Sequence, residues 1–160
     1  MKPGAFFGPR RVRAGCLVFQ DPLFLCAALY LLLYFDGGGF LRISLLAAVL
    51  HECGHILIFC GIKRRLPRIL VGITGLSMRT RGENLTPGQT FLLAAAGPGT
   101  NLLLAGIWYG RICIRATLWD DAFLAANVLL AGFNLLPVPP LDGARMIGAA
   151  RDVMRNRRQK

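Results

Sequence analysis

Long apolar runs separated by short basic segments constrain the fold of this chain more than any other feature. Four such runs lie near residues 17–35, 40–62, 91–109 and 118–136. Each approaches the ~20 residues that a helix needs to cross the ~30 Å hydrocarbon core of a bilayer. Only 17% of the residues are charged, against about 25% in an average soluble domain. The pattern predicts one all-α polytopic membrane domain over residues 1–160, with about four transmembrane helices.

The basic residues predict how such a protein is oriented. The formal net charge is +11, and all but three of the 19 Lys and Arg residues lie before the first run, between the second and third runs, or after the fourth. Because Lys and Arg mark the cytoplasmic side of membrane proteins, both termini are expected to be cytoplasmic. The basic residues are spread between apolar runs and do not form a patch on a polar surface, so no nucleic-acid partner is expected.

Two segments outside the apolar runs have patterns of their own. In residues 69–78, Ile69, Val71 and Ile73 alternate with other residues, which predicts a short strand or β-hairpin. Because an unpaired strand edge cannot lie in lipid, the segment is expected at the membrane edge, where an extended substrate would pair with it. The basic tail, residues 144–160, has apolar residues near helical spacing and predicts an amphipathic surface helix.

The sequence His51-Glu52-Cys53-Gly54-His55 lies inside the second apolar run and contains the only two histidines. Positions four apart share one face of a helix, so both imidazoles can bind one metal ion, with Glu52 beside it as the base that activates water. Cys53 lies about 200° around the helix from His51 and is expected to point away. Ionisable groups at membrane depth are costly and usually functional. The alternative is a buried, hydrogen-bonded pair without a metal.

A third metal ligand is expected, because catalytic zinc usually has three protein ligands and one open position. With no further histidine, it is sought among the eight acidic residues. Asp142 follows the fourth run, on the predicted cytoplasmic side. The second run ends on the same side, so His51 and His55 are expected to lie towards it. Topology therefore favours Asp142 over the other acidic residues. The alternative is that Asp142-Gly143 is an ordinary turn.

Two further motifs carry a resemblance to a known family. The segment 133–143, FNLLPVPPLDG, resembles the second signature of the site-2 protease family, an Asn-x-x-Pro followed by Asp-Gly. Gly97-Pro98-Gly99-Thr100-Asn101 resembles the family's Gly-Pro-x-x-Asn element. Together with the histidine motif, they come in the family's order over residues 51–143. The resemblance is strongest to the compact bacterial branch that includes a sporulation protease of a sigma-factor precursor.

This resemblance implies a function and a set of site residues. It implies Zn²⁺ as cofactor, with Asp142 as the third ligand beside His51 and His55. It also implies that Asn134 positions the substrate or polarises its carbonyl, and that Asn101 supports the site. The implied activity is an intramembrane zinc metalloendopeptidase that cleaves a membrane-associated or single-span substrate, such as a regulatory factor precursor.

The resemblance also implies a setting for the protein. We expect a multi-pass protein of the bacterial cytoplasmic membrane, with the lipid bilayer, a protein or peptide substrate and a regulatory membrane protein as partners. The sequence carries no signal for an oligomeric state. Only 17 residues follow Gly143, so no appended nucleotide-sensing or PDZ-like domain is expected in this chain.

Two alternatives from other classes stay open. A non-catalytic metal-binding membrane protein, either a metal carrier or an inactive protease relative, would bind metal without cleaving peptides. A carrier is less expected, because the sequence lacks the paired broken helices of an inverted repeat. A structural or scaffold protein with an accidental His-Glu-x-x-His motif would bind no stoichiometric zinc.

Overall fold

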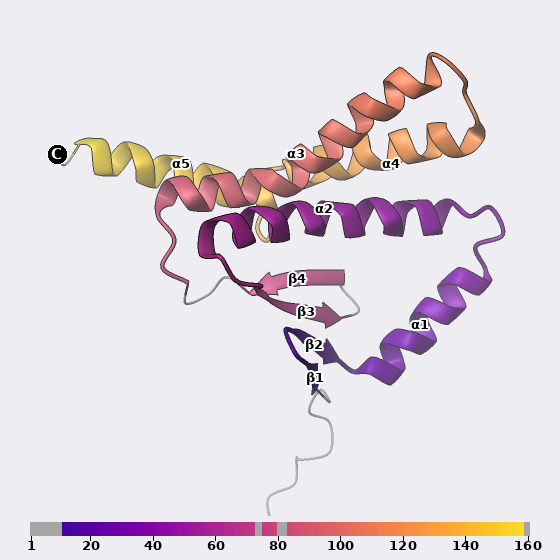
Figure 1. The fold of residues 1–160 in the computed structure, drawn as a ribbon, viewed down its shortest axis with the longest axis horizontal. Helices are drawn as coiled ribbons and strands as arrows, with labels where there is room; N and C mark the ends of the chain where they lie inside the picture. The colour runs from indigo at the N-terminus through magenta and orange to yellow at the C-terminus, as the bar shows by residue number, and fades with distance from the viewer. Residues whose placement is uncertain (1–10, 73–74, 80–82, 159–160) are drawn as a thin grey trace, which may run out of the picture.

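The computed structural model describes residues 11–72, 75–79 and 83–158, as helices joined to one small sheet (Figure 1). The first part of the chain contains β1 (Arg11–Ala14), β2 (Leu17–Gln20), α1 (Pro22–Tyr34) and α2 (Phe40–Lys63). The hairpin strands β3 (Arg68–Gly72) and β4 (Gly75–Arg79) follow, and then α3 (Pro87–Ile112), α4 (Leu118–Asn134) and α5 (Asp142–Arg158).

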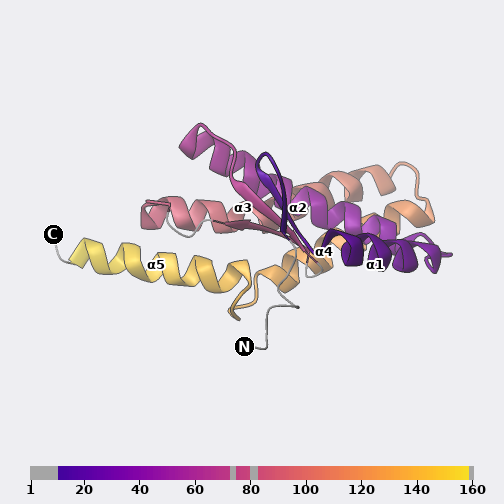
Figure 2. The same cartoon turned by 90° about the horizontal axis from the view of Figure 1, so that it is seen from below.

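Helix α2 lies at the centre of the arrangement. Helices α3 and α4 pack against it and against each other, and α5 packs against α3. The sheet lies on the other side of α2 in Figure 1, with β4 as the strand that contacts that helix. Helix α1 buries none of its residues. Figure 2 shows α5 running beside the first part of α3, with its C-terminal end beyond the other helices.

The sheet has the strand order β1-β2-β3-β4. The hairpins β1–β2 and β3–β4 are antiparallel, while β2 and β3 pair in parallel, with Leu17 opposite Ile69. The hairpin predicted for residues 69–78 is therefore confirmed, and Ile69 lies opposite Met78 within it. Residues 73 and 74 at its tip lie outside the described part of the chain.

The first span, predicted over residues 17–35, is wrong at its start. Residues Leu17–Gln20 form β2, and Asp21 has a left-handed backbone with φ of +48°. Helix α1 begins only at Pro22, whose missing N–H and fixed φ suit the first turn of a helix. With 13 residues, this helix is about 20 Å long at 1.5 Å per residue, shorter than the ~30 Å core of a bilayer.

The other predicted helices are present with shifted ends. Helices α2 and α3, with 24 and 26 residues, are long and apolar enough to cross a membrane. Helix α4 has 17 residues and ends at Asn134, two residues before the predicted end. The tail helix α5 is confirmed and begins at Asp142, two residues earlier than expected.

Buried and exposed residues are distributed in a way that is unusual for a soluble protein. Large apolar side chains are exposed on the outside of the helices, such as Leu57, Leu103 and Leu129, at 71%, 66% and 71%. Where the helices meet, small residues allow close contact, and polar residues bond between helices, as is common in membrane bundles. Six polar residues are buried in the described part of the chain: His51, His55, Asn101, Asp120, Asn127 and Asp142.

Candidate metal centre

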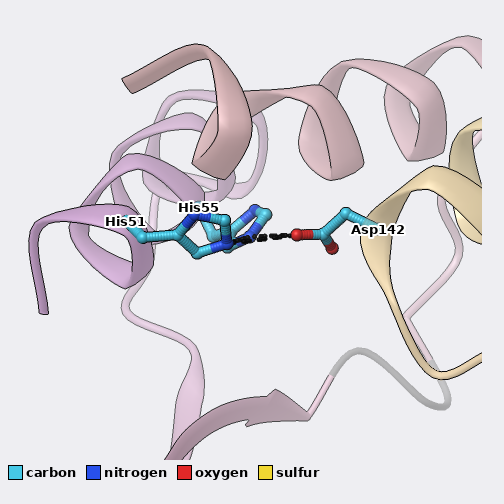
Figure 3. A group of neighbouring side chains, drawn as sticks. All are labelled: His51, His55 and Asp142. Atoms are coloured by element: carbon cyan, nitrogen blue, oxygen red, sulfur yellow. Dashed lines mark hydrogen bonds and ion pairs between the residues drawn. The ribbon is translucent and has the colours of Figure 1, made fainter. Parts of the chain in front are cut away.

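Two histidines and an aspartate from distant parts of the sequence meet inside the helix bundle. His51 and His55 lie one turn apart on α2, and Asp142 is the first residue of α5 (Figure 3). The Asp142 Oδ2 lies 3.2 Å from His51 Nε2 and 3.0 Å from His55 Nε2, and the two Nε2 atoms are 3.2 Å apart. All three residues are at most 6% exposed. The structure therefore brings together the three residues predicted as metal ligands.

Local structure at the starts of α2 and α5 positions the two sides of this cluster. The start of α2 is fixed by Asp36, whose carboxylate accepts hydrogen bonds from the backbone N–H groups of Leu41 and Arg42 at 3.2 and 3.1 Å. On the other side, Gly143 lets the start of α5 lie against the end of α4. A Cβ added at Gly143 would lie only 2.1 Å from the Leu135 carbonyl oxygen. The Asp-Gly pair thus places the Asp142 carboxylate at a point that the start of α5 could not reach with a residue larger than glycine at position 143.

The hydrogen bonds of the two imidazoles determine which nitrogen faces the centre of the cluster. His55 Nδ1 lies 2.8 Å from the Leu93 carbonyl oxygen, which can only accept, so this nitrogen donates. His51 Nδ1 likewise donates to the Asn101 side-chain oxygen. In a neutral imidazole with hydrogen on Nδ1, Nε2 carries the lone pair. Both Nε2 atoms therefore present lone pairs to Asp142.

Three acceptor atoms that converge in this way are suited to a cation. The two Nε2 atoms and the Asp142 carboxylate oxygen lie within 4.8 Å of one another, and without positive charge between them they repel. Two neutral imidazoles and one carboxylate form a donor set that zinc enzymes use.

Gly97 on α3 keeps space free beside these atoms. A Cβ at Gly97 would lie 2.3 Å from His55 Nε2 and 2.5 Å from His51 Nε2. The donor set and the space left by this glycine both fit a zinc ion, held by His51, His55 and Asp142.

The charge state of Asp142 also suits a metal ligand. Burial disfavours the charged form of its carboxyl group, so that form needs a positive charge nearby. Arg145, one turn along α5, adds an Nη1 contact of 3.5 Å to the other carboxylate oxygen. Asp142 is therefore ionised at neutral pH, the form that binds a metal ion.

The other predicted site residues occupy different positions around the cluster. Glu52 is half-buried next to His51. Cys53 is exposed, which confirms that it points away.

The two predicted asparagines differ in their distance from the histidines. Asn101 is fully buried against His51. Asn134, the last residue of α4, donates its amide to the Leu130 carbonyl at 2.9 Å. Within the described ranges, Asn134 makes no hydrogen bond to His51, His55 or Asp142. Its predicted role towards the substrate stays a prediction.

Sequence reasoning missed two contributors to this centre. Asn127 on α4 is fully buried and accepts a hydrogen bond from Asn101. An asparagine inside an apolar run was the available signal, because such a residue is costly without a partner. The Leu93 carbonyl supports His55 and had no signal, because every residue has a carbonyl group.

Comparisons with known proteins agree with this site. No protein-family model matches the chain. A Mycobacterium tuberculosis protein named "Putative zinc metalloprotease Rip3" is 34% identical over 134 residues, which is 77% of this chain and 33% of the relative. "Putative zinc metalloprotease MJ0611" of Methanocaldococcus jannaschii is 38% identical over 70 residues, 41% of this chain and 37% of the relative. The chain thus spans about a third of the length of these relatives.

A solved structure shares the fold. The "Site-2 Protease from Methanocaldococcus jannaschii" superposes with a TM-score of 0.61 over 89% of this chain and 71% of that one, at 21% identity. The arrangement of helices and sheet is therefore that of a site-2 protease, and the relatives by sequence carry zinc-metalloprotease names. The chain belongs to the site-2 protease family, as the motifs predicted. The narrower likeness to the sporulation-protease branch stays a prediction.

Proposed function

We propose that this chain is an intramembrane zinc metalloprotease that hydrolyses peptide bonds of a membrane-associated or single-span protein. One observation carries the proposal. Two imidazole nitrogens and a carboxylate oxygen converge in a buried site, with the Glu52 carboxylate on the residue next to the first imidazole. This arrangement supplies the three protein ligands and the adjacent base that metal-assisted hydrolysis requires.

Each side chain has a distinct part in the proposed reaction. A bound zinc ion would supply a Lewis acid that polarises the scissile carbonyl and makes water more acidic. Glu52 would take the proton from the attacking water and pass it to the leaving amine. Asn134 has two amide hydrogens and uses one on the Leu130 carbonyl. The other would hold a substrate carbonyl.

The sheet offers a way to hold the substrate in an extended form. A helical substrate hides its carbonyl groups in its own hydrogen bonds, so the peptide must unwind before it is cut. Strand β4 is an outer strand of the sheet and contacts α2, the helix that carries both histidines. Main-chain pairing with an outer strand would present the peptide next to that helix.

The membrane setting is part of the same proposal. Helices α2 and α3 have the length and composition to cross a bilayer, and the outside of the bundle is apolar. The family also consists of membrane proteins. We place both termini in the cytoplasm because of the basic residues that flank the apolar runs. In this orientation the cluster would lie towards the cytoplasmic ends of its helices.

Glu52→Gln tests the proposal, because it removes the base and keeps the size of the side chain. The parent and the variant are each co-expressed with a panel of single-span membrane proteins, and mass spectrometry follows cleavage. We expect equal zinc content in the two proteins, and cleavage lowered by about 10²–10⁴-fold in the variant.

The outcomes separate the proposal from its alternatives. Equal cleavage by parent and variant would refute the role of Glu52. A parent protein that holds stoichiometric zinc yet cleaves no member of the panel would favour the non-catalytic metal-binding alternative. A parent without stoichiometric zinc would overturn the metal site itself.

A further inference from the structure

We propose that Asn127 is a positioning residue for the metal centre. Through Asn101 it fixes the His51 imidazole in the tautomer that carries hydrogen on Nδ1 and directs the Nε2 lone pair towards Asp142. This inference rests on the proposed function, because it assigns a purpose to a residue that supports a proposed zinc ligand. Hydrogen bonds link three buried side chains, Asn127, Asn101 and His51, one from each of α4, α3 and α2.

The first step is the orientation of Asn127. Its side chain is 0% exposed, and its Nδ2 donates to the Phe123 carbonyl oxygen at 2.8 Å. A backbone carbonyl can only accept a hydrogen bond, so the NH₂ end of the amide must face Phe123. The oxygen end of Asn127 must then face Asn101.

The second step transfers this orientation to α3. Asn101 is also 0% exposed, and its Nδ2 donates to the Asn127 Oδ1 at 2.8 Å. The Ala47 carbonyl oxygen, at 3.4 Å, is a second acceptor on the same side. If the Asn101 amide were turned over, its oxygen would face two acceptors. Its NH₂ end therefore stays towards Asn127, and its oxygen faces α2.

The third step reaches the metal ligand. The Asn101 Oδ1 faces His51 Nδ1, so this nitrogen must carry the hydrogen, and Nε2 is left with the lone pair. His55 obtains the same tautomer in one step, because its Nδ1 donates directly to the Leu93 carbonyl. Through Asn101 alone, His51 reaches a backbone acceptor only at the long 3.4 Å contact with the Ala47 carbonyl. The path with short bonds of 2.8 Å continues through Asn127 to the Phe123 carbonyl. Asn127 therefore supplies the shorter, stronger link from these side chains to the backbone.

Nitrogen NMR of the metal-free protein in detergent tests the tautomer directly. The chain contains two histidines, so labelling with ¹⁵N-histidine yields four ring-nitrogen signals, and His55 serves as an internal reference. In the parent we expect hydrogen on Nδ1 of both rings. In Asn127→Leu, which has a similar volume and no amide, Asn101 can turn over, and we expect His51 to lose its Nδ1 hydrogen while His55 keeps it.

Asn127→Asp is the matched conservative variant. A carboxyl group accepts from Asn101 whether it is neutral or ionised, so the Asn101 oxygen still faces His51. We expect this variant to keep the hydrogen on His51 Nδ1. A role confined to packing would not separate the aspartate variant from the leucine variant in this way.

Zinc affinity gives a second measurement, by competition with a chelator. Loss of a hydrogen-bond partner behind a metal-bound histidine typically lowers affinity about 10–100-fold, and we expect a loss in that range for Asn127→Leu. In a protein that carries Asn101→Asp, a carboxylate oxygen faces His51 in either orientation. Asn127→Leu should therefore cost at most about twofold in that background.

The outcomes decide between the inference and its rivals. A parent His51 without hydrogen on Nδ1 overturns the inference, even if Asn127→Leu yields no folded protein. It is also overturned if Asn127→Leu changes the His51 and His55 signals equally, or costs the same affinity with and without Asn101→Asp. The NMR measurement uses no metal, so a parent that binds no zinc would refute the proposed function and leave this test readable.

Discussion

Two buried carboxylates at opposite ends of the bundle have very different surroundings. Asp120, in the first turn of α4, is 4% exposed and accepts hydrogen bonds from Trp108 Nε1 at 3.1 Å and Thr117 Oγ1 at 2.6 Å. Arg111 adds contacts of 3.1 and 3.2 Å to its two oxygens. Asp142 is 6% exposed, and its Oδ2 faces two imidazole nitrogens that present lone pairs.

The difference shows how a structural carboxylate can be told from a metal ligand. Both oxygens of Asp120 meet donors, so the cluster is complete and joins α3 to α4. The Thr117 hydroxyl, the Arg111 guanidinium and the Trp108 N–H all donate to this carboxylate and stabilise its charged form. Around Asp142 acceptors face acceptors, so that cluster lacks positive charge at its centre. Burial is the same in both places, and only the partners differ.

The largest expected effect is on zinc binding. His55→Ala removes one of the three acceptors, so we expect loss of stoichiometric zinc, a larger effect than the about 10–100-fold cost of losing a ligand's supporting partner. Asp120→Asn is the matched change at the complete cluster and should leave the zinc content unchanged. Elemental analysis of the purified proteins measures both. Zinc retained by His55→Ala, or lost in Asp120→Asn, would contradict the conclusion that the Asp142 cluster binds the metal and the Asp120 cluster does not.

A smaller but specific effect is expected from one methyl group on α3. In Gly97→Ala the new Cβ would lie 2.3 Å from His55 Nε2, so the imidazoles must move. Zinc affinity should then fall by at least about 10-fold, the lower end of the range for loss of a ligand's supporting partner. Gly99→Ala is the control, because a Cβ there meets no atom within 4 Å. Chelator competition compares the two variants. Equal affinities would show that Gly97 does not keep the metal space free.

The smallest expected effect concerns stability at the Asp120 end. The ionised carboxylate of Asp120 accepts hydrogen bonds from Trp108, Thr117 and Arg111, so its contribution to stability is present at neutral pH and is lost as acid protonates the group. Asp120→Asn should therefore lower the melting temperature at neutral pH, and the difference from the parent should shrink in acid. Thermal unfolding in detergent across this pH range measures it. The control is the neighbouring Asp121→Asn, on an exposed side chain, which should change neither the melting temperature nor its dependence on pH. A pH-independent difference between Asp120→Asn and the parent would contradict the prediction.

The metal cluster was predictable because its signals are local and chemical. The spacing of His51 and His55 sets their shared helix face, and topology alone favours Asp142 among the acidic residues. The strand Leu17–Gln20 was not predictable in this way, because a short apolar segment reads the same in a helix and in a strand. One of its two partner strands, β3, is about fifty residues away. Asn127 was missed because its function lies in the direction of a hydrogen bond, which depends on three helices at once.

The parallel pairing of β2 with β3 has a practical consequence for anyone who trims or tags this protein. The segment before α1 supplies one whole side of the main-chain hydrogen bonds of β3. Deleting residues 11–20 would leave β3–β4 as an isolated hairpin, a structure that is marginal on its own. The unpaired edge of β3 could then pair with strands of other chains. Shortened versions of the protein should therefore keep this basic leading segment, even though it lies far in sequence from the histidines.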